Sequence, residues 1–261
     1  MDLNLKGKRA VVCGSSQGIG KASAVELALL GASVTLIARN EATLTTAVAE
    51  LNDGDDKHHN YLVADFNFPD QLKKVINEYT ATNAVDILVN NTGGPPPGLA
   101  VDASPEDYLN AFRSHLLCNQ ILTQAVVEGM KKKRYGRIIN IISTSVKTPI
   151  KGLGVSNTIR GAVANWAKTL SIELGPFGIT VNNVLPGATM TQRLQSVLKE
   201  KAEQTGKTQE QLMQEMVADI PVGRISEAHE VAAAVAFLAS PAAGYINGIN
   251  IPVDGGRTKS L

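Results

Sequence analysis

A glycine-rich segment near the start of the chain has the residue types and spacing that bind a phosphate. It reads GSSQGIG over residues 14–20, follows a short apolar run and opens a helical pattern. Glycines let the backbone turn tightly and approach a pyrophosphate, and the free N–H groups at a helix N-terminus attract its negative charge. The segment therefore predicts a dinucleotide site, and the residues expected to bind are Gly14, Ser16, Gln17, Gly18, Ile19 and Gly20.

The end of the second apolar run bears on which dinucleotide binds. A site for NAD usually has an acidic residue here, which holds the 2′-hydroxyl of the ribose. This chain has Ala38-Arg39-Asn40 instead, and a guanidinium suits a 2′-phosphate because it forms forked, charge-assisted bonds. The sequence therefore favours NADP(H) over NAD. The other interpretation of Arg39 is a solvated surface charge, and Gln17 adds no second positive group.

Apolar runs alternate with helical patterns along the chain, and these elements must position the phosphate site. We predict strands over residues 9–13, 33–38, 60–64, 87–90, 137–142, 180–185 and 249–253. We predict helices over residues 18–30, 41–51, 69–79, 104 to about 132, 156–174 and 227–239. Apolar strands separated by helices are typical of a parallel sheet that is covered on both sides. The prediction is an α/β protein with one doubly wound Rossmann domain over residues 1–261, containing a seven-stranded parallel sheet with helices on both faces.

Residues 190–218, within the longer segment 190–222, differ in composition from the rest of the chain. They are polar, rich in glutamine and helical in pattern, and Thr208 and Gln211 have the spacing of a capping box. In a doubly wound fold, a segment between the sixth strand and the next core helix lies above the carboxyl edge of the sheet, where ligands bind. We interpret it as a helical substrate lid within the domain, and a peripheral helical pair is the alternative.

The composition excludes several classes of protein. The chain has 261 residues, a formal net charge of +1 and two cysteines, Cys13 and Cys118. Such a small charge argues against nucleic-acid binding, and two cysteines build neither a disulfide framework nor a four-cysteine zinc site, so we predict no nucleic acid and no metal. The N-terminal residues lack the apolar core of a signal peptide, and no apolar run reaches the roughly 18 residues of a membrane span. We therefore predict a soluble cytoplasmic protein with no membrane partner and with reduced thiols.

Further motifs follow the glycine-rich segment in an order that is specific as a set. They are ADF at 64–66, NNTG at 90–93, GRIIN at 136–140, PG at 186–187 with Thr191, and VDGG at 253–256. Over nearly the whole chain, this set resembles the short-chain dehydrogenase/reductase family. The resemblance implies that Asp65 contacts an adenine and that the turn with Pro186, Gly187 and Thr191 cups the nicotinamide. The further cofactor-binding residues that it implies are Phe66, Asn91, Thr92 and Gly93.

The catalytic part of the resemblance is incomplete. The family uses a tyrosine as proton donor, a lysine that lowers the pKa of the tyrosine and holds the ribose, a serine that polarises the carbonyl, and an asparagine that orders water. Aligned on Gly136, the serine position is Ser143, but Ser156 stands at the tyrosine and Arg160 at the lysine. The asparagine position is His115, with Asn119 as the alternative. With SNxxR in place of YxxxK and GGPPPG at 93–98, the chain resembles an atypical subgroup similar to β-ketoacyl-carrier-protein reductases.

These substitutions change the chemistry expected of the site. A serine hydroxyl is a far weaker acid than a tyrosine beside an ammonium, whereas Arg160 still supplies charge and hydrogen bonds to a ribose. Three other side chains could serve the proton transfer. His115 titrates near neutrality, Lys147 lies in the loop after Ser143, and Lys151 is a similar but weaker candidate. Ser143 itself could polarise a carbonyl. The alternatives are a structural histidine between helices and a solvent-exposed lysine.

The leading hypothesis is an NADP(H)-dependent oxidoreductase that interconverts a carbonyl and an alcohol, with 3-oxoacyl (β-ketoacyl) compounds as one substrate class. Its catalytic residues would be Ser143, Ser156, Arg160, His115 and Lys147. The alternative is a dinucleotide-binding pseudoenzyme or redox sensor that lacks turnover, and a scaffold that no longer binds nucleotide is a third possibility. The expected partner is a small-molecule carbonyl or acyl-thioester substrate. The resemblance also implies a homo-oligomer, a dimer or a homotetramer, that pairs the helices at 105–132 and 156–174.

Overall fold

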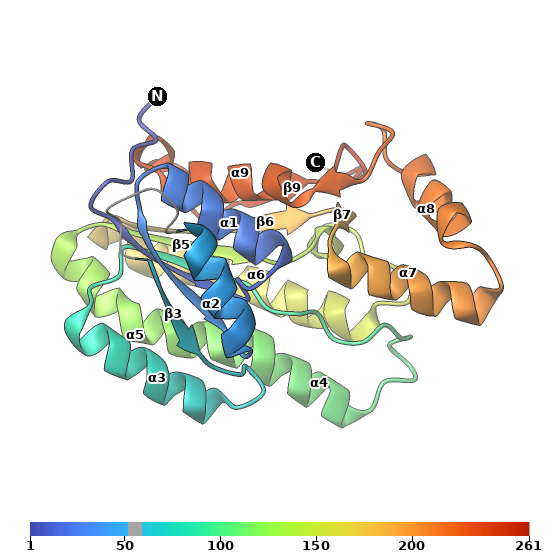
Figure 1. Cartoon of the computed structure of the whole chain (residues 1–261), viewed down its shortest axis with the longest axis horizontal. Helices are drawn as coiled ribbons and strands as arrows, with labels where there is room; N and C mark the ends of the chain where they lie inside the picture. Colours follow the sequence, from blue (N-terminus) through green and yellow to red (C-terminus); the bar gives the residue numbers. More distant parts are fainter. Residues whose placement is uncertain (52–58, 261) are drawn as a thin grey trace.

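Seven strands form one parallel sheet in the part of the chain that this computed structural model describes, residues 1–51 and 59–260 (Figure 1). Their order is β3-β2-β1-β4-β5-β6-β9, and every adjacent pair is parallel. The strands are β1 Arg9–Cys13, β2 Ser33–Ala38, β3 Asn60–Val63, β4 Ile87–Asn90, β5 Gly136–Ile141, β6 Ile179–Pro186 and β9 Asn250–Val253. The predicted doubly wound sheet is confirmed, with boundaries that move by one residue at several strand ends.

Helices flank the sheet, and short turns join some of them. The helices are α1 Gly18–Leu29, α2 Glu41–Leu51, α3 Pro69–Thr82, α4 Pro105–Phe112, α5 Cys118–Lys133, α6 Gly154–Leu174, α7 Gln192–Thr205, α8 Gln209–Ala218 and α9 Ala228–Ala239. The turns are η1 Arg113–Leu117, η2 Thr144–Val146, η3 Gly175–Phe177 and η4 Pro241–Ala243. A separate two-stranded ladder pairs β7 Thr189–Met190 with β8 Ser226–Glu227.

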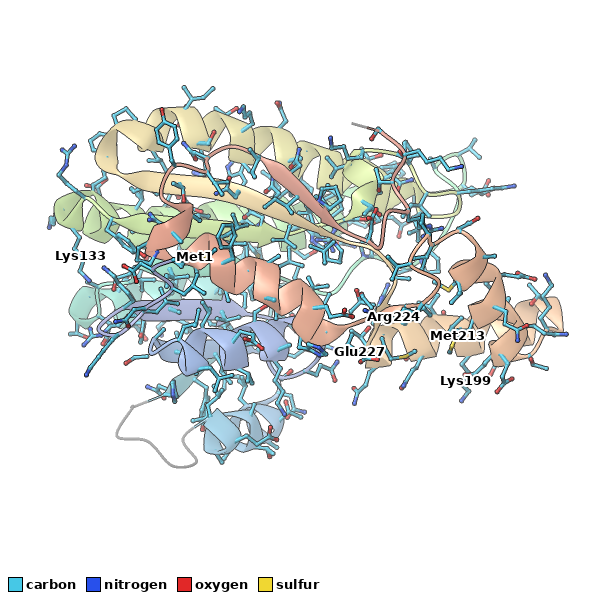
Figure 2. All side chains as sticks on the ribbon, turned by 90° about the horizontal axis from the view of Figure 1, so that it is seen from above. Met1, Lys133, Lys199, Met213, Arg224 and Glu227 are labelled. Carbon is cyan, nitrogen blue, oxygen red and sulfur yellow. The ribbon has the colours of Figure 1, made fainter. Side chains whose placement is uncertain are left out.

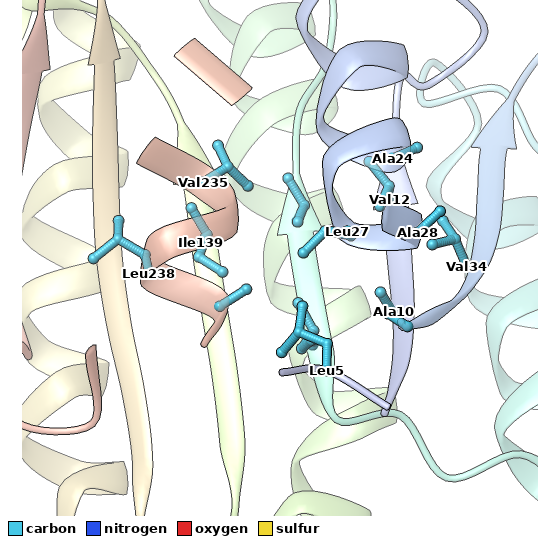
Figure 3. Packing of buried hydrophobic residues seen from close by; sticks show 14 of the residues in the cluster. Leu5, Ala10, Val12, Ala24, Leu27, Ala28, Val34, Ile139, Val235 and Leu238 are labelled. Atoms are coloured by element: carbon cyan, nitrogen blue, oxygen red, sulfur yellow. The ribbon is translucent and has the colours of Figure 1, made fainter. Parts of the chain in front are cut away.

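Two apolar layers hold the helices on the sheet. On one face, Leu27 of α1 and Val235 and Leu238 of α9 share a cluster with Val12 of β1 and Ile139 of β5 (Figure 3). On the opposite face, residues of α3, α5 and α6 form a second cluster with the other sides of the strands. The inner strands are therefore buried on both faces, which explains why their sequences are largely apolar without alternation. The edge strands β3 and β9 are only partly buried.

The helix predicted from residue 104 to about 132 is interrupted in the structure. It starts as predicted, because Ser104 and Asp107 form a capping box. A π turn, η1, then separates α4 from α5. A π turn inserts an extra residue and so rotates the side chains that follow, and such turns are frequent at functional sites. Here it buries His115 between α5 and α6. Local sequence gives no sign of this, since the segment is helical in pattern throughout.

The strand order places the site at the carboxyl edge of the sheet. The chain runs outward from β1 to β3 and then returns to β4 on the other side of β1, and ligands bind beside such a reversal. Helices α7 and α8 extend beyond this edge at one end of the molecule (Figure 1). The predicted capping box at Thr208 and Gln211 is confirmed at the start of α8. None of the helices within residues 1–51 and 59–260 has the length and apolar character to cross a membrane.

A row of asparagine side chains crosses four neighbouring strands inside the sheet. The amide of Asn90 donates to Asn140, that of Asn140 to Asn183, and that of Asn183 to Asn250, each at 2.8 Å. Asn140 lies in the middle of the row and is fully buried. The row links β4, β5, β6 and β9, so it helps to fix the relative positions of the strands that carry the site.

Asn140→Ala is expected to lower the free energy of unfolding by about 2–4 kcal/mol, because it leaves a buried donor on Asn90 and a buried acceptor on Asn183 without partners. Urea unfolding measures the loss. Asn165→Ala, which changes an exposed asparagine of α6, is the control and should stay within about 0.5 kcal/mol of the parent. A loss below about 1 kcal/mol for Asn140→Ala would show that the row contributes little.

Candidate active site

The glycine-rich segment forms a tight turn between β1 and α1. Gly14 and Gly18 have φ values of +56° and +59°, in the left-handed region that favours glycine. A Cβ on Gly14 would lie 2.7 Å from Asn91 Nδ2, and one on Gly20 would collide with the carbonyl oxygen of Gly14. Gln17 provides no side-chain cap for α1, so no capping side chain competes for the first N–H groups. The turn is thus a cradle of backbone N–H groups suited to an anion.

The turn after β4 is attached to this cradle. Asn91 Nδ2 donates to the carbonyl oxygens of Cys13 and Gly14, both at 3.2 Å. Thr92 and Gly93 continue from it, and a Cβ on Gly93 would meet nothing within 4 Å. The structure therefore brings the predicted residues of these two turns together, with open space beside Gly93.

A third segment, after β6, faces the cradle from the other side. Pro186 ends β6, and Gly187 N–H donates to the carbonyl oxygen of Val253 on β9 at 2.9 Å. The Thr191 side chain lies 3.4 Å from where a Cβ of Gly18 would lie. Thr191 also caps α7, since its Oγ1 accepts from the Leu194 N–H. The start of α7 therefore lies directly against the glycine-rich turn.

The residues predicted to contact the adenosine half lie at neighbouring strand ends. Arg39 is exposed just after β2, and among the described residues its guanidinium has no hydrogen-bond or ion-pair partner. Asp65 follows β3, and its Oδ1 accepts from the Asn67 N–H at 2.9 Å. The Phe66 side chain belongs to the apolar core, so a contact from this residue would come from its backbone. Ser16 and Ile19 are partly exposed in the glycine-rich turn.

Ser143 and Arg160 lie at the end of β5 and on the helix that packs against it. Ser143 Oγ accepts a hydrogen bond from the Ser145 N–H at 3.1 Å, which leaves its own O–H free to donate. Arg160 is buried on α6 and donates from Nη1 to the Ile141 carbonyl oxygen at 2.9 Å. Its Nε, also buried, has no partner among the described residues. Ser156 lies one turn earlier on α6 and is partly exposed.

His115 is buried beside Arg160, and this changes its expected chemistry. Its side chain is 2 % exposed and its Nε2 has no hydrogen-bond partner among the described residues. Burial, followed by the positive charge of Arg160, lowers the pKa of His115 well below its usual value of 6.5. The expectation that His115 titrates near neutrality was therefore wrong, because sequence alone does not show this environment. At neutral pH the imidazole is uncharged and offers hydrogen bonds rather than a readily released proton.

The protein is expected to lose stability as the pH falls below about 6.5, because the unfolded chain protonates His115 there and the folded chain does not. The contribution reaches about 1.4 kcal/mol per pH unit until the pKa of the folded state is passed. His115→Asn removes it, so urea unfolding between about pH 7 and pH 5 should show a shallower slope for the variant. His229→Asn, at an exposed histidine, is the control. Equal slopes for His115→Asn and the parent would contradict the assignment.

The glycine–proline segment at 93–98 is held against the loop that precedes α6. Gly98 N–H donates to the Gly152 carbonyl oxygen at 2.7 Å, and Gly154 N–H donates to Gly98 at 2.9 Å. Asn157 Nδ2 closes the same loop by donating to the Ile150 carbonyl oxygen at 2.9 Å. Lys147 lies at the start of this loop and is partly buried. These bonds tie segment 93–98 to the start of α6, the helix that carries Ser156.

Sequence reasoning missed one charged residue of the site, Arg193. It lies in the first turn of α7, two positions after Thr191, and its Nη2 donates to the Pro95 carbonyl oxygen at 2.9 Å. Only its closeness to Thr191 in the sequence could have drawn attention to it. Arg193 Nη2 and Arg160 Nη2 lie 3.9 Å and 3.8 Å from the position that a Cβ of Gly94 would occupy, so the two guanidinium groups both lie next to this glycine. Burial, followed by the positive charge of Arg193, lowers the pKa of Arg160 to about 10. Arg160 therefore remains positive at neutral pH.

No tyrosine takes the place left by Ser156. All five tyrosines lie in the described residues, and four of their hydroxyls bond elsewhere, to Glu41 (Tyr61), Thr35 (Tyr79), Ala100 (Tyr108) and Ala239 (Tyr135). The fifth, Tyr245, is fully exposed.

In the described part of the chain, the cysteines and the metal-binding residue types offer no further chemistry. Burial raises the pKa of both thiols, Cys13 and Cys118, the latter to about 12. Within residues 1–51 and 59–260, no group of three or more histidine, cysteine or acidic side chains is placed to hold a metal ion.

Comparison with known proteins shows extensive similarity. A family profile described as "Enoyl-(Acyl carrier protein) reductase" matches residues 14–258. The 3-oxoacyl-(acyl-carrier-protein) reductase FabG of Vibrio cholerae is 34% identical over 257 residues, which cover 97% of this chain and 98% of the relative. The structure of L-sorbose reductase from Gluconobacter frateurii, complexed with NADPH and L-sorbose, superposes with a TM-score of 0.94 at 29% identity and covers 100% of both chains. YwfH, an NADPH-dependent reductase involved in bacilysin biosynthesis, has a TM-score of 0.92 at 30% identity, covering 97% of this chain and 99% of its own.

Proposed function

The chain belongs to the short-chain dehydrogenase/reductase family, and we propose that it uses NADP(H) at the carboxyl edge of its sheet to interconvert a carbonyl and an alcohol. It is an NADP-dependent oxidoreductase, as its reductase relatives are. The observation that carries the proposal is the backbone cradle of Gly14, Gly18 and Gly20, which faces Thr191 and in which a Cβ at Gly14 or Gly20 would collide with its surroundings.

The residues present fit the cofactor at both ends. The N-terminus of α1 and the glycine-rich turn would hold the pyrophosphate. Arg39, exposed at the end of β2, would bind the 2′-phosphate, with Asp65 at the adenine. The unpartnered Arg160 Nε offers a donor to the nicotinamide ribose. The turn with Gly187 and the open space beside Gly93 would accept the nicotinamide. The other residues proposed to bind the cofactor, at its various parts, are Ser16, Gln17, Ile19, Phe66, Asn91, Thr92, Pro186 and Thr191.

NADPH, when bound, supplies the hydride that reduces the carbonyl carbon. The Ser143 hydroxyl would donate a hydrogen bond to the carbonyl oxygen, because its O–H has no acceptor among the described residues. The positive charge of Arg160 stabilises the negative charge that develops on this oxygen. Ser156 and Lys147 pass the proton from water, since a serine hydroxyl is too weak an acid to be its source. Neutral His115 offers its free Nε2 to a water molecule in this path.

The relatives suggest two classes of substrate. The Vibrio cholerae relative reduces 3-oxoacyl groups, and the Gluconobacter frateurii structure contains L-sorbose. A 3-oxoacyl thioester and a small ketone are thus the two starting candidates. We assign residues 190–222, which contain α7 and α8, as a lid over the substrate within the single domain, because α7 begins at the cradle itself.

We further propose that the protein forms a homo-oligomer. Helix α4 with η1 exposes Leu109, Phe112 and Leu117, and α6 with η3 exposes Ile172 and Phe177. Exposed large apolar residues on these helices fit an interface. Light scattering after size-exclusion chromatography tests this, since a monomeric mass would reject it.

Cofactor binding and turnover test the proposed function in two steps. The protein should bind NADPH at least about 10-fold more tightly than NADH by fluorescence titration, and Arg39→Glu should reduce or reverse that ratio. NADPH oxidation is then followed with 3-oxoacyl thioesters, L-sorbose and simple ketones. Turnover supports the proposal. Tight NADPH binding without turnover on any of them favours the non-catalytic alternative, a dinucleotide sensor, and absence of binding rejects both.

A further inference from the structure

The guanidinium groups of Arg160 and Arg193 both lie close to Gly94, next to the proposed site. Arg160 Nη2 and Arg193 Nη2 lie 3.8 Å and 3.9 Å from the same point, the position that a Cβ of Gly94 would occupy. Arg160 belongs to α6, and Arg193 belongs to α7, where its contact with Pro95 holds it in place. Both groups are positive, Arg160 is buried and Arg193 is exposed, so the two charges repel each other beside Gly94. An anion between them would relieve this repulsion.

Within the part of the chain that the structure describes, no acidic side chain forms an ion pair with Arg160 or Arg193. Arg160 Nε and His115 Nε2 are nine-tenths or more buried and have no hydrogen-bond partner. Arg193 uses one N–H on Pro95 and keeps the rest of its planar fork. Among the described residues, the two arginines thus hold positive charge without an acidic partner and keep unused N–H donors.

We propose that Arg193, with Arg160 beside it, binds a carboxylate of the substrate, so that the substrate is a small keto acid or hydroxy acid. This inference rests on the proposed function, because Arg160 is the residue assigned to the nicotinamide ribose. An anion held between the two arginines must then lie close to the reacting carbonyl, within the same small molecule. A 3-oxoacyl thioester is uncharged at that position, whereas a carboxylate matches the fork of a guanidinium.

A phosphate of the cofactor is the other anion that could reach Arg193. The structure favours an anion of the substrate over a phosphate of the cofactor. The turn at 14–20 forms the phosphate cradle, whereas the Nη2 atoms of Arg160 and Arg193 lie next to Gly94. Segment 93–98 is paired with the loop before α6, on the side of Ser156. The two sources predict different effects of Arg193→Gln on cofactor affinity.

The experiment measures NADPH binding first and carboxylate binding second. Fluorescence titration gives the Kd for NADPH, and calorimetry on the NADP⁺-loaded protein then compares acetoacetate, 2-oxobutanoate and levulinate with their methyl esters. At least one acid should bind about 10-fold or more tightly than its ester, and Arg193→Gln should remove most of that difference while changing the NADPH Kd by less than about two-fold. Higher ionic strength should weaken the acid but not the ester.

Lys199→Gln is the matched control, because it removes one positive charge from an exposed position further along the same helix (Figure 2). It should leave acid and ester affinities as in the parent. Equal binding of every acid and its ester overturns the inference. It is also overturned if Arg193→Gln weakens NADPH as much as it weakens the acid, since the anion is then that of the cofactor. Failure to bind NADPH at all instead rejects the proposed function, so the two failures are distinguishable.

Discussion

Ser143→Ala is expected to lower kcat/KM for carbonyl reduction by about 100-fold or more, because it removes the donor that stabilises the developing oxyanion. In the family's usual site, a tyrosine hydroxyl acts together with this serine hydroxyl. Here all five tyrosines are placed elsewhere, so no second acidic hydroxyl compensates. NADPH affinity should stay within about two-fold, since Ser143 is assigned to the substrate oxygen and not to the cofactor.

Two further variants separate this role from a structural one. Ser143 also accepts a hydrogen bond from the Ser145 N–H, so its removal carries a small stability cost. Ser143→Thr keeps the hydroxyl and should recover a large part of kcat, whereas Thr148→Ala, at an exposed hydroxyl of the same loop, should behave as the parent. If Ser143→Ala retains kcat/KM within about three-fold, Ser143 does not polarise the carbonyl.

The sequence predicts the cofactor half of the site better than the catalytic half, and the reason is physical. The phosphate cradle depends on local conformation, because Gly14 and Gly18 need positive φ values within one short turn. Consecutive residues encode such a turn, and so they also encode its position between a strand and a helix. The order of the strands likewise follows from a regular alternation of elements.

The catalytic half depends on contacts between distant segments. The low pKa of His115 arises from burial against Arg160 on another helix, and the π turn that positions His115 has an ordinary helical sequence. Arg193 reaches the site only because α7 packs beside segment 93–98. The asparagine row requires the register of four strands. None of these arrangements is encoded by a local motif, so only the structure reveals them.

Replacing Arg160 should weaken NADPH binding but raise the stability of the free protein. Arg160→Met keeps most of the side-chain volume but removes the charge, so NADPH should bind about 10- to 100-fold more weakly through the loss of charged hydrogen bonds to the ribose. The free protein should become more stable by about 1–4 kcal/mol, or at least no less stable, because replacing a buried charge with an apolar side chain is often favourable. NADPH titration and urea unfolding measure the two effects.

The burial of Arg160 supports this expectation. Burial and then Arg193 lower the pKa of Arg160 to about 10, which means that the folded state disfavours the charged form relative to water. Below about pH 10 the guanidinium is protonated in both the folded and the unfolded protein, so the full cost of burying its charge lowers the free energy of unfolding. Arg160→Lys, which restores an ammonium at this position, should recover part of the NADPH affinity. A large loss of stability in Arg160→Met would contradict the argument, because it would show that the guanidinium stabilises the fold and is not kept for ligand binding.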